Sequence, residues 1–294
     1  MAGKPNGMIR EHARYESASP RNAMSVDVEE YFQVAAFERQ VRKDDWGTFP
    51  SRVEWNTGRV LDLFAAKGVR ATFFVLGWVA ERHPGLVRRI VAEGHELASH
   101  GYDHTRVIYM DQRAFREDVV RTKRILEDTG GIRVRGYRAP SYSIGAGNLW
   151  ALDVLHETGH EYSSSIYPIR HDLYGMPEAP RFAFRVREQA ILELPVTTVE
   201  WGGSKLPAGG GGFFRLLPYA AYRWALRRVN ELDHQPGIFY FHPWEVDAGQ
   251  PRIERAPLKS RFRHYVNLGT MEARLARLLD DFRWGRVDEV FGLQ

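Results

Sequence analysis

The stretch Ala71-Thr-Phe-Phe-Val-Leu76 decides the fold, because an apolar run of this length suits a strand that is buried on both faces. A helical stretch at residues 78–93 follows it, and Gly94 is placed to end that helix. Residues 95–99 then form a second segment of strand type. A strand, a helix and another strand in this order make the unit from which parallel sheets and barrels are built.

The same alternation runs through the rest of the chain. Further strands are predicted at residues 23–28, 136–139, 161–166, 190–196 and 237–241. Further helices are predicted from Asn56 or Thr57 to Gly68, from a cap at Asp111 through Leu126, and at residues 148–158, 218–232 and 271–282. This order predicts an α/β fold, with helices outside a sheet or barrel of parallel strands.

Two segments stand apart from the alternation. Residues 202–212 contain six glycines, a composition typical of flexible connections, so we predict a mobile loop there. Residues 1–22 are polar and show no secretory signal pattern, and we expect them to form a flexible N-terminal arm. Residues 23–294 are then expected to form a single domain, with a C-terminal extension from about residue 246.

Composition restricts the class of protein. The 294-residue chain is 44% hydrophobic and 27% charged, which is typical of a globular protein with a sizeable core. Basic and acidic residues are interspersed and the net charge is +4, so we expect a solvated surface and no nucleic-acid partner. No apolar run is long enough for a transmembrane helix, and we expect a cytoplasmic location. Without cysteine, His, Asp and Glu are the strong metal ligands that remain.

Ionisable residues fall at the carboxyl ends of the predicted strands, where parallel barrels build their active sites. Asp27 and Glu29 close the first strand, and an extended backbone points both to one side because side chains repeat every two residues. Two neighbouring carboxylates repel unless a cation neutralises them or their roles differ. A solvated strand end is the alternative interpretation.

Two histidines follow the strand at residues 95–99. His100 and His104 are four residues apart, a spacing that can bring both imidazoles to one cation across a helical turn or in a compact loop. Gly101 favours the loop. Two histidines with one carboxylate form a ligand set of catalytic sites that keep a position open for water, so the sequence indicates a divalent metal.

Arg138 and His242 lie at two other strand ends. Arg138 either carries a surface charge or, inside a strand, orients a carboxylate through paired hydrogen bonds. His242 follows the apolar run at residues 239–241, and it is either a core histidine or a proton donor that titrates near neutral pH.

In this order, Asp27 with Glu29, His100-x-x-x-His104, Arg138-Ala-Pro140 and His242 resemble the motifs of the NodB-type polysaccharide deacetylases, carbohydrate esterase family four. The resemblance covers residues 23–245 and implies a distorted (β/α) barrel of about seven parallel strands. The motif sequences most resemble those of the exosortase-associated exopolysaccharide deacetylases. These share the Asp-Val-Glu opening, the Tyr-Pro-Ile-Arg-His-Asp-Leu-Tyr-Gly run at 167–175 and Phe-His-Pro-Trp-Glu at 241–245.

The resemblance also implies roles for these residues. Asp27 would be the general base, Arg138 its partner, and His242 the general acid. The implied ligands of zinc or a similar divalent metal are Glu29, His100 and His104. The implied reaction removes N-acetyl groups from hexosamine units of a polysaccharide, or of its lipid-linked precursor, in exopolysaccharide biosynthesis.

The chain departs from the family pattern at two positions. Most members have adjacent acids in the first motif, whereas Val28 lies between Asp27 and Glu29 here. The family also carries an acid in the segment that reads Tyr162-Ser-Ser-Ser-Ile166, where Ser163 replaces it. If that acid orients the arginine or tunes the acid histidine, another residue must take over its role, or activity is reduced.

Two alternatives remain open at this point. Some proteins similar to the family hydrolyse small cyclic amides or imides, and a catalytically silent carbohydrate-binding protein is also compatible with the replacement at Ser163. Aromatic faces suit sugar stacking, so Trp201, Trp244 and the glycine-rich segment favour an extended carbohydrate. Trp244, or the loop near Ser141 and Tyr142, is expected to line the sugar pocket.

Overall fold

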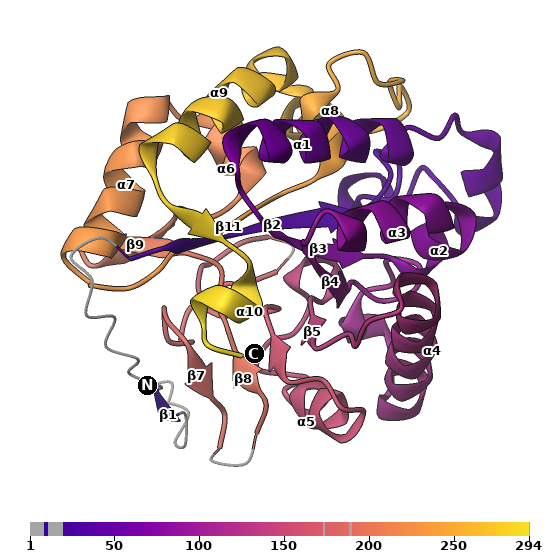
Figure 1. The fold of residues 1–294 in the computed structure, drawn as a ribbon, viewed down its shortest axis with the longest axis horizontal. Coiled ribbons are helices and arrows are strands. Elements are labelled where there is room, and N and C mark those ends of the chain that lie inside the picture. The colour runs from indigo at the N-terminus through magenta and orange to yellow at the C-terminus, as the bar shows by residue number, and fades with distance from the viewer. Residues whose placement is uncertain (1–8, 11–19, 173, 188–189, 294) are drawn as a thin grey trace.

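The strands form one curled sheet in the computed structural model, which describes residues 9–10, 20–172, 174–187 and 190–293 (Figure 1). Every neighbouring pair in the run β11-β2-β3-β4-β5-β6-β8 is parallel. These strands are β11 (Ile238–Phe241), β2 (Asn22–Val28), β3 (Thr72–Val75), β4 (Glu96–Ser99), β5 (Gly136–Tyr137), β6 (Tyr162–Ser163) and β8 (Leu192–Glu193). The predicted α/β class is therefore confirmed, as a curled half-barrel of parallel strands.

The edges of the sheet are completed by shorter strands. Beyond β8 lie β7 (Phe184–Arg185) and β1 (Ile9–Arg10), both antiparallel to their neighbours, and β12 (Trp284–Gly285) pairs with β2. No ladder joins β8 to β11 among the described residues. Instead, the Thr197 hydroxyl donates to the Ile238 carbonyl at 2.9 Å, so the chain after β8 draws the two ends of the sheet together. Most of the predicted N-terminal arm lies outside the described residues.

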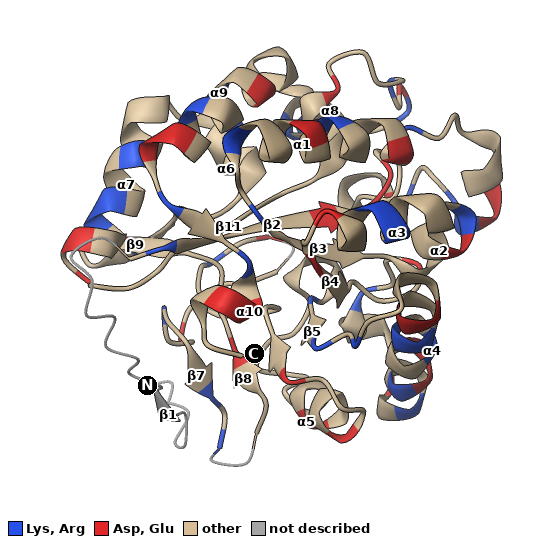
Figure 2. Cartoon of the chain, viewed as in Figure 1, with Lys and Arg blue, Asp and Glu red and all other residues tan. Residues whose placement is uncertain are grey.

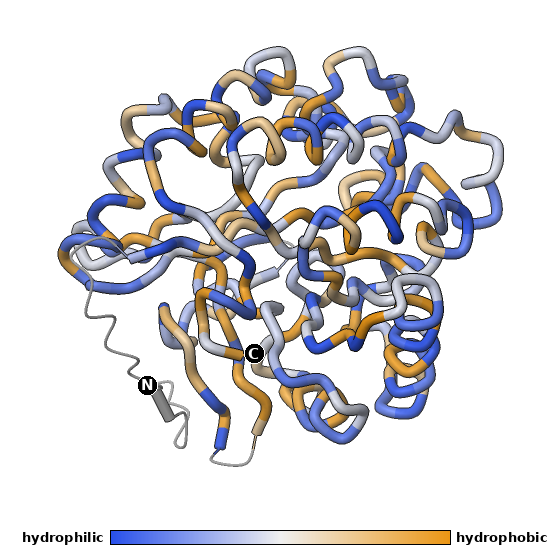
Figure 3. Tube along the Cα trace, in the orientation of Figure 1, coloured by the Kyte–Doolittle hydropathy of each residue, from blue (hydrophilic) through white to orange (hydrophobic). Residues whose placement is uncertain are grey.

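Helices cover the outer face of the sheet, and α1 and α9 lie side by side on it (Figure 1). The helices are α1 (Val53–Lys67), α2 (Gly77–Arg82), α3 (Pro84–Ala92), α4 (Gln112–Gly130), α5 (Trp150–Glu157), α6 (Gly211–Leu216), α7 (Tyr219–Glu231), α8 (Leu258–Tyr265), α9 (Leu268–Asp281) and α10 (Val287–Val290). The strands of the sheet are largely hydrophobic, and the outer turns of the helices are largely hydrophilic (Figure 3).

Alternation along the strands creates two buried layers. Met24 and Val26 of β2 and Phe73 of β3 belong to the large core under the outer helices. Ala23 of β2 and Phe74 of β3 belong to a separate core on the other face of the sheet. Because side chains alternate between faces, the inner face of β2 is also the face of Ser25 and Asp27.

Several predicted strands are shorter in the structure, and two predicted helices differ from it for a physical reason that can be named. Helix α1 begins at Val53 instead of Asn56 or Thr57, because the Glu30 carboxylate accepts from the Arg52 amide at 3.0 Å and meets the helix N-terminus from outside the helix. The predicted helix at 78–93 is two helices, since His83 precedes Pro84 and has a non-helical φ of −126° and ψ of 58°.

The glycine-rich segment at residues 202–212 also differs from its prediction. Gly202 and Gly203 form the turn of a hairpin between β9 (Thr198–Trp201) and β10 (Ser204–Pro207), and Gly211 and Gly212 begin α6, so the segment is not a mobile loop. Gly202 and Gly203 have φ values of 57° and 75°, as a tight hairpin turn with two left-handed residues requires. Gly202 and Gly203 therefore specify the tight turn of the β9–β10 hairpin.

The surface charges agree with the expected solvated surface. Lys and Arg are interspersed with Asp and Glu on outer helices such as α4 (Figure 2). Within the described part of the chain, no helix has the length and apolar character needed to span a bilayer.

Candidate metal centre and pocket

The inner face of β2 carries a buried ion pair. Arg138, directly after β5, donates from Nη1 to Asp27 Oδ1 at 2.6 Å, and both side chains are buried. The same nitrogen donates to the Ser25 hydroxyl at 2.9 Å. Ser164 fixes the rest of the guanidinium, because its carbonyl accepts from Nε at 3.1 Å and its hydroxyl from Nη2 at 3.0 Å. Asp27 is therefore held in one orientation by a rigid partner.

The two histidines of the His-x-x-x-His motif lie on a compact loop after β4. Gly101 and His104 have φ values of 74° and 57°, so the chain turns through left-handed conformations and does not form a helical turn. The carbonyls of Gly101 and Tyr102 accept from the first amides of α2, at 3.0 and 2.8 Å. The loop is thus tied to the neighbouring β3–α2 connection.

Glu29, His100 and His104 form a group that could hold a metal ion. One ligand atom from each residue lies within 4.8 Å of those from the others. Glu29 Oε2 is 2.9 Å from His104 Nε2 and 3.9 Å from His100 Nε2, yet it accepts no well-formed hydrogen bond from the described residues. A buried carboxylate oxygen without a hydrogen bond, facing two imidazole nitrogens, fits a divalent cation with an open coordination position.

His100 is prepared for such a ligand role. Its Nδ1 lies 2.9 Å from the Arg138 carbonyl, an acceptor that keeps the proton on Nδ1 and leaves Nε2 free for a cation. Burial lowers the pKa of His100 to about 4, despite the nearby Asp27 and Glu29 carboxylates. The imidazole is therefore neutral at pH 7, which is the form that binds metals.

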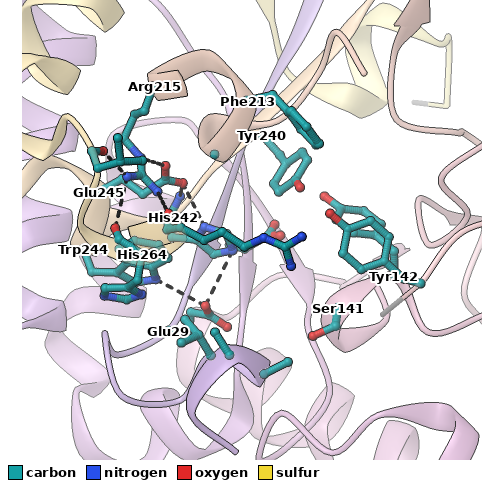
Figure 4. Close-up of a pocket in the computed structure, with 18 of the residues that line it drawn as sticks. Glu29, Ser141, Tyr142, Phe213, Arg215, Tyr240, His242, Trp244, Glu245 and His264 are labelled. Carbon is teal, nitrogen blue, oxygen red and sulfur yellow. Dashed lines mark hydrogen bonds and ion pairs between the residues drawn. The ribbon is translucent and has the colours of Figure 1, made fainter. Parts of the chain in front are cut away.

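His242 lies on the other side of Glu29 and begins a buried chain of charges (Figure 4). Its Nε2 is 3.5 Å from Glu29 Oε1, and its Nδ1 is 2.9 Å from Glu245 Oε1. Glu245 in turn accepts from Arg215 Nε at 2.7 Å, and both of these side chains are almost fully buried. Glu245 thus orients the imidazole, and Arg215 orients Glu245.

This chain of charges sets the protonation of His242. Burial alone would lower the pKa of His242, but the Glu29 and Glu245 carboxylates outweigh burial and raise it to about 9. Burial would raise the pKa of Glu245, but Arg215 and His242 lower it to about 2. A cation at Glu29 would remove part of the increase at His242, because it neutralises one of the two carboxylates. With no cation bound at Glu29, His242 carries a proton at pH 7.

These groups share a cavity of about 460 Å³ at the carboxyl ends of the strands. Its wall opposite Glu29 and His242 carries Ser141, Tyr142 and Tyr240 (Figure 4). Ser141 and Tyr142 have φ values of 53° and 50°, and such strained conformations in non-glycine residues are concentrated at functional sites.

The two tryptophans considered for sugar stacking, Trp244 and Trp201, differ in their surroundings. Trp244 lines the cavity but is 5% exposed, because it stacks on His242 and His264 with ring centroids 5.0 and 4.0 Å away. Its indole nitrogen donates to Glu29 Oε1 at 3.3 Å, so it supports the ionic groups more than it offers a free face to a sugar. Trp201 lies on the β9–β10 hairpin and does not line the cavity, so it is not one of the groups that would contact a sugar bound there.

The structure also shows what surrounds Ser163. Ser163 on β6 pairs with Glu193 on β8, and the buried Glu193 carboxylate accepts from the amides of Ser165 and Ile166 at 2.8 Å. Burial raises the pKa of Glu193 to about 7. An acid is therefore present beside Ser163, but it comes from the neighbouring strand.

The sequence interpretation missed Glu245, Arg215 and Glu193. A signal was available for Glu245, because an acid three residues after His242 can bond back to the start of a helical turn, and the Glu245 carboxylate does accept from the His242 amide at 3.0 Å. No local signal identified Arg215 or Glu193, because each meets its partner across 30 residues of chain or on another strand.

A half-barrel that brings a Glu/His/His group, an arginine-bound aspartate and a carboxylate-bound histidine into one cavity has the groups used in metal-assisted hydrolysis. Comparison with known proteins narrows this class. Residues 43–163 match the family described as polysaccharide deacetylase, and residues 164–292 match a domain of unknown function, DUF3473.

Two curated relatives agree with the first match. Over 84 residues, 29% of this chain and 30% of the relative, the chain is 34% identical to a peptidoglycan-N-acetylglucosamine deacetylase of Bacillus cereus. Over 66 residues, 22% of this chain and 31% of the relative, it is 44% identical to a chitooligosaccharide deacetylase of Rhizobium leguminosarum bv. trifolii. The chain thus spans less than a third of the length of these two relatives. The matches support the resemblance to the NodB-type polysaccharide deacetylases.

Solved structures share the fold. The crystal structure of a putative polysaccharide deacetylase from Mycobacterium smegmatis superposes with a TM-score of 0.63 and 18% identity, over 97% of this chain and 94% of that one. The Puue allantoinase superposes with a TM-score of 0.60 and 16% identity, over 96% and 92%. Because structures named as an allantoinase and as a putative polysaccharide deacetylase share this fold, the side chains of the cavity must decide the reaction.

Proposed function

We propose that the chain is a metal-dependent deacetylase that removes N-acetyl groups from hexosamine units of a polysaccharide. Zinc is the proposed metal, and exopolysaccharide biosynthesis the proposed context. The observation that carries the proposal is the convergence of the Glu29, His100 and His104 group with Asp27 and His242 in one cavity. The named activities of the aligned relatives, on peptidoglycan N-acetylglucosamine and on chitooligosaccharides, support this substrate class.

Each group has a proposed role. Glu29, His100 and His104 hold the cation, which when bound acidifies a water molecule and polarises the acetyl carbonyl. Asp27 accepts a proton from the attacking water, and Arg138 keeps its carboxylate facing the cavity. The water oxygen bonds to the acetyl carbon, and the carbon–nitrogen bond breaks.

The departing nitrogen needs a proton, and His242 is the proposed donor. Its Nδ1 is bonded to Glu245, so Nε2 is the nitrogen that faces Glu29 and the cavity. Base and acid are thus a carboxylate bound by Arg138 and an imidazole bound by Glu245. The products are acetate and a hexosamine with a free amine.

We also propose the narrower assignment to the exosortase-associated subgroup, on the basis of the Asp-Val-Glu opening, the run at 167–175 and the run at 241–245. In this run His242 is the proposed acid, Glu245 is its partner, and Trp244 donates to Glu29. The run lies in the segment that matches the domain of unknown function, so this segment supplies part of the proposed active site.

The proposal is tested by acetate release from an N-acetylglucosamine oligomer. The chain is stripped with a chelator and reloaded with zinc, cobalt or manganese, and metal content is measured alongside acetate. We expect release that depends on the metal. Asp27→Asn, which keeps the size of the side chain, is expected to retain the metal while turnover falls by at least about 1000-fold.

The alternatives give other results. A cyclic-amide hydrolase would open hydantoin or allantoin and leave the oligomer intact. A silent carbohydrate-binding protein would bind the oligomer, with measurable heat, and release no acetate with any metal. Either result would exclude the proposed function.

A further inference from the structure

Exposed apolar side chains gather at one side of the cavity mouth. They are Leu258 (81% exposed), Phe262 (60%), Leu216 (48%) and Leu217 (36%), and we call them the rim patch. Phe262 on α8 and Leu216 on α6 both line the cavity, and Leu258 lies one helical turn before Phe262. An apolar group of this kind, exposed around the opening of a cavity, marks an interaction surface.

The rim patch is held by a rigid support. Arg215, buried under it, donates to the carbonyls of Arg263 and His264 at 3.2 and 3.0 Å, and so ties the end of α6 to the end of α8. The same arginine binds Glu245. The exposed side chains therefore project from fixed backbone next to the proposed active site.

Cations flank the part of the rim patch that lies on α8. The segment 252–263 contains five basic residues and one acid, Glu254. Lys259 and Arg263 share the carboxylate of Asp172. Arg255 and Arg261 have no carboxylate partner among the described residues. Positive charge is thus in excess around an apolar centre, and basic residues are visible on α8 (Figure 2).

We propose that the rim patch docks the protein on an anionic lipid surface. Apolar side chains on a short helix enter the boundary between headgroups and acyl chains, and flanking cations bind anionic headgroups. The excess of unpaired cations favours this occupant over a second copy of the chain, which would bring the same positive charge to the contact. Docking is independent of the proposed function, but one consequence rests on it: the cavity would open beside the membrane, where a lipid-linked saccharide is presented.

Vesicle sedimentation of the full chain tests the docking. We expect binding to vesicles of phosphatidylcholine and phosphatidylglycerol in equal parts, weakened by salt, and little binding to phosphatidylcholine alone. Arg255→Gln with Arg261→Gln is expected to lower the partition coefficient on the order of 30-fold, because each cation near such a surface contributes about 1 kcal/mol. Leu217→Ser with Leu258→Ser, at positions outside the cavity lining, is expected to weaken binding at least about 10-fold.

The matched control is Trp201→Ser with Leu232→Ser, which removes apolar groups that are 66% and 62% exposed elsewhere on the surface. This variant is expected to bind vesicles like the parent. Absence of vesicle binding, or equal loss in the control, overturns the proposal. So does self-association that the Leu217 and Leu258 variant abolishes, since a second copy would then cover the patch. Acetate release from the oligomer, measured in parallel, tests the proposed function separately.

Discussion

His100 and His242 lie on two sides of the same carboxylate, and their surroundings give them opposite properties. His100 is 3.9 Å from Glu29 and His242 is 3.5 Å from it. The second neighbour of each imidazole differs: a neutral backbone carbonyl for His100, and the Glu245 carboxylate for His242. Burial dominates at the first and lowers its pKa to about 4, whereas charge dominates at the second and raises its pKa to about 9.

This contrast shows how one cavity can contain both a metal ligand and a proton donor made from the same residue type. The partner on Nδ1 decides which role each imidazole can take. Arg215 pairs with the buried Glu245 carboxylate beside His242. Burying this paired carboxylate costs less free energy than burying an isolated one.

His104→Ala removes one of the three candidate metal ligands. Without one of three ligands we expect loss of bound zinc, and a fall in kcat/KM of at least about 1000-fold, because the cation supplies several kcal/mol of charge stabilisation. Metal content by mass spectrometry and acetate release are the measurements. His171→Ala removes another histidine that lines the cavity and should retain zinc. Full zinc occupancy in His104→Ala would refute the ligand assignment.

His242→Ala removes the proposed proton donor. We expect retained zinc and a rate on the N-acetyl oligomer lower by about 100-fold or more, because the amine leaves without a positioned proton donor. On 4-nitrophenyl acetate the loss should be smaller, since a nitrophenolate leaves unprotonated. An equal loss on both substrates would assign His242 a role other than the acid.

Glu245→Gln tests how much the carboxylate partner of His242 contributes, because it removes one negative charge beside the imidazole. Glu245 raises the pKa of His242, so its loss lowers that pKa, and His242 loses its proton at a lower pH. The basic limb of the kcat profile should move to lower pH, with a rate reduced by about 10- to 100-fold. Asp247→Asn is the matched control, because Asp247 pairs with Arg52 outside the cavity and its loss should leave the limb in place.

The smallest effect is expected for Ser163→Asp, which restores the acid of the family pattern. The new carboxylate would face buried Glu193, whose pKa is already raised to about 7, so two like charges would share one site. We expect the free energy of unfolding to fall by about 1 to 3 kcal/mol without a gain in rate. Chemical denaturation measures the first and acetate release the second. A faster enzyme would show that Ser163 limits activity.

The domain of residues 23–294, the cytoplasmic location and the roles of the six site residues stay predictions. The alternation of apolar runs and helical periods was sufficient for the fold class, because burial on both faces of a parallel sheet leaves a periodic signal in the chain. The same reading failed at α1, where a carboxylate from another loop caps the helix, and at the glycine-rich hairpin.

The α/β class and the six ionisable residues at strand ends could be read from the amino-acid sequence, since strand ends and their side chains are local features. The partners of these residues follow from the tertiary structure. Arg138 reaches Asp27 across 111 positions, and Arg215 reaches Glu245 across 30. Such contacts depend on how distant strands and helices pack, and a pKa depends on those contacts, so neither the neutral His100 nor the protonated His242 could be inferred from neighbouring residues.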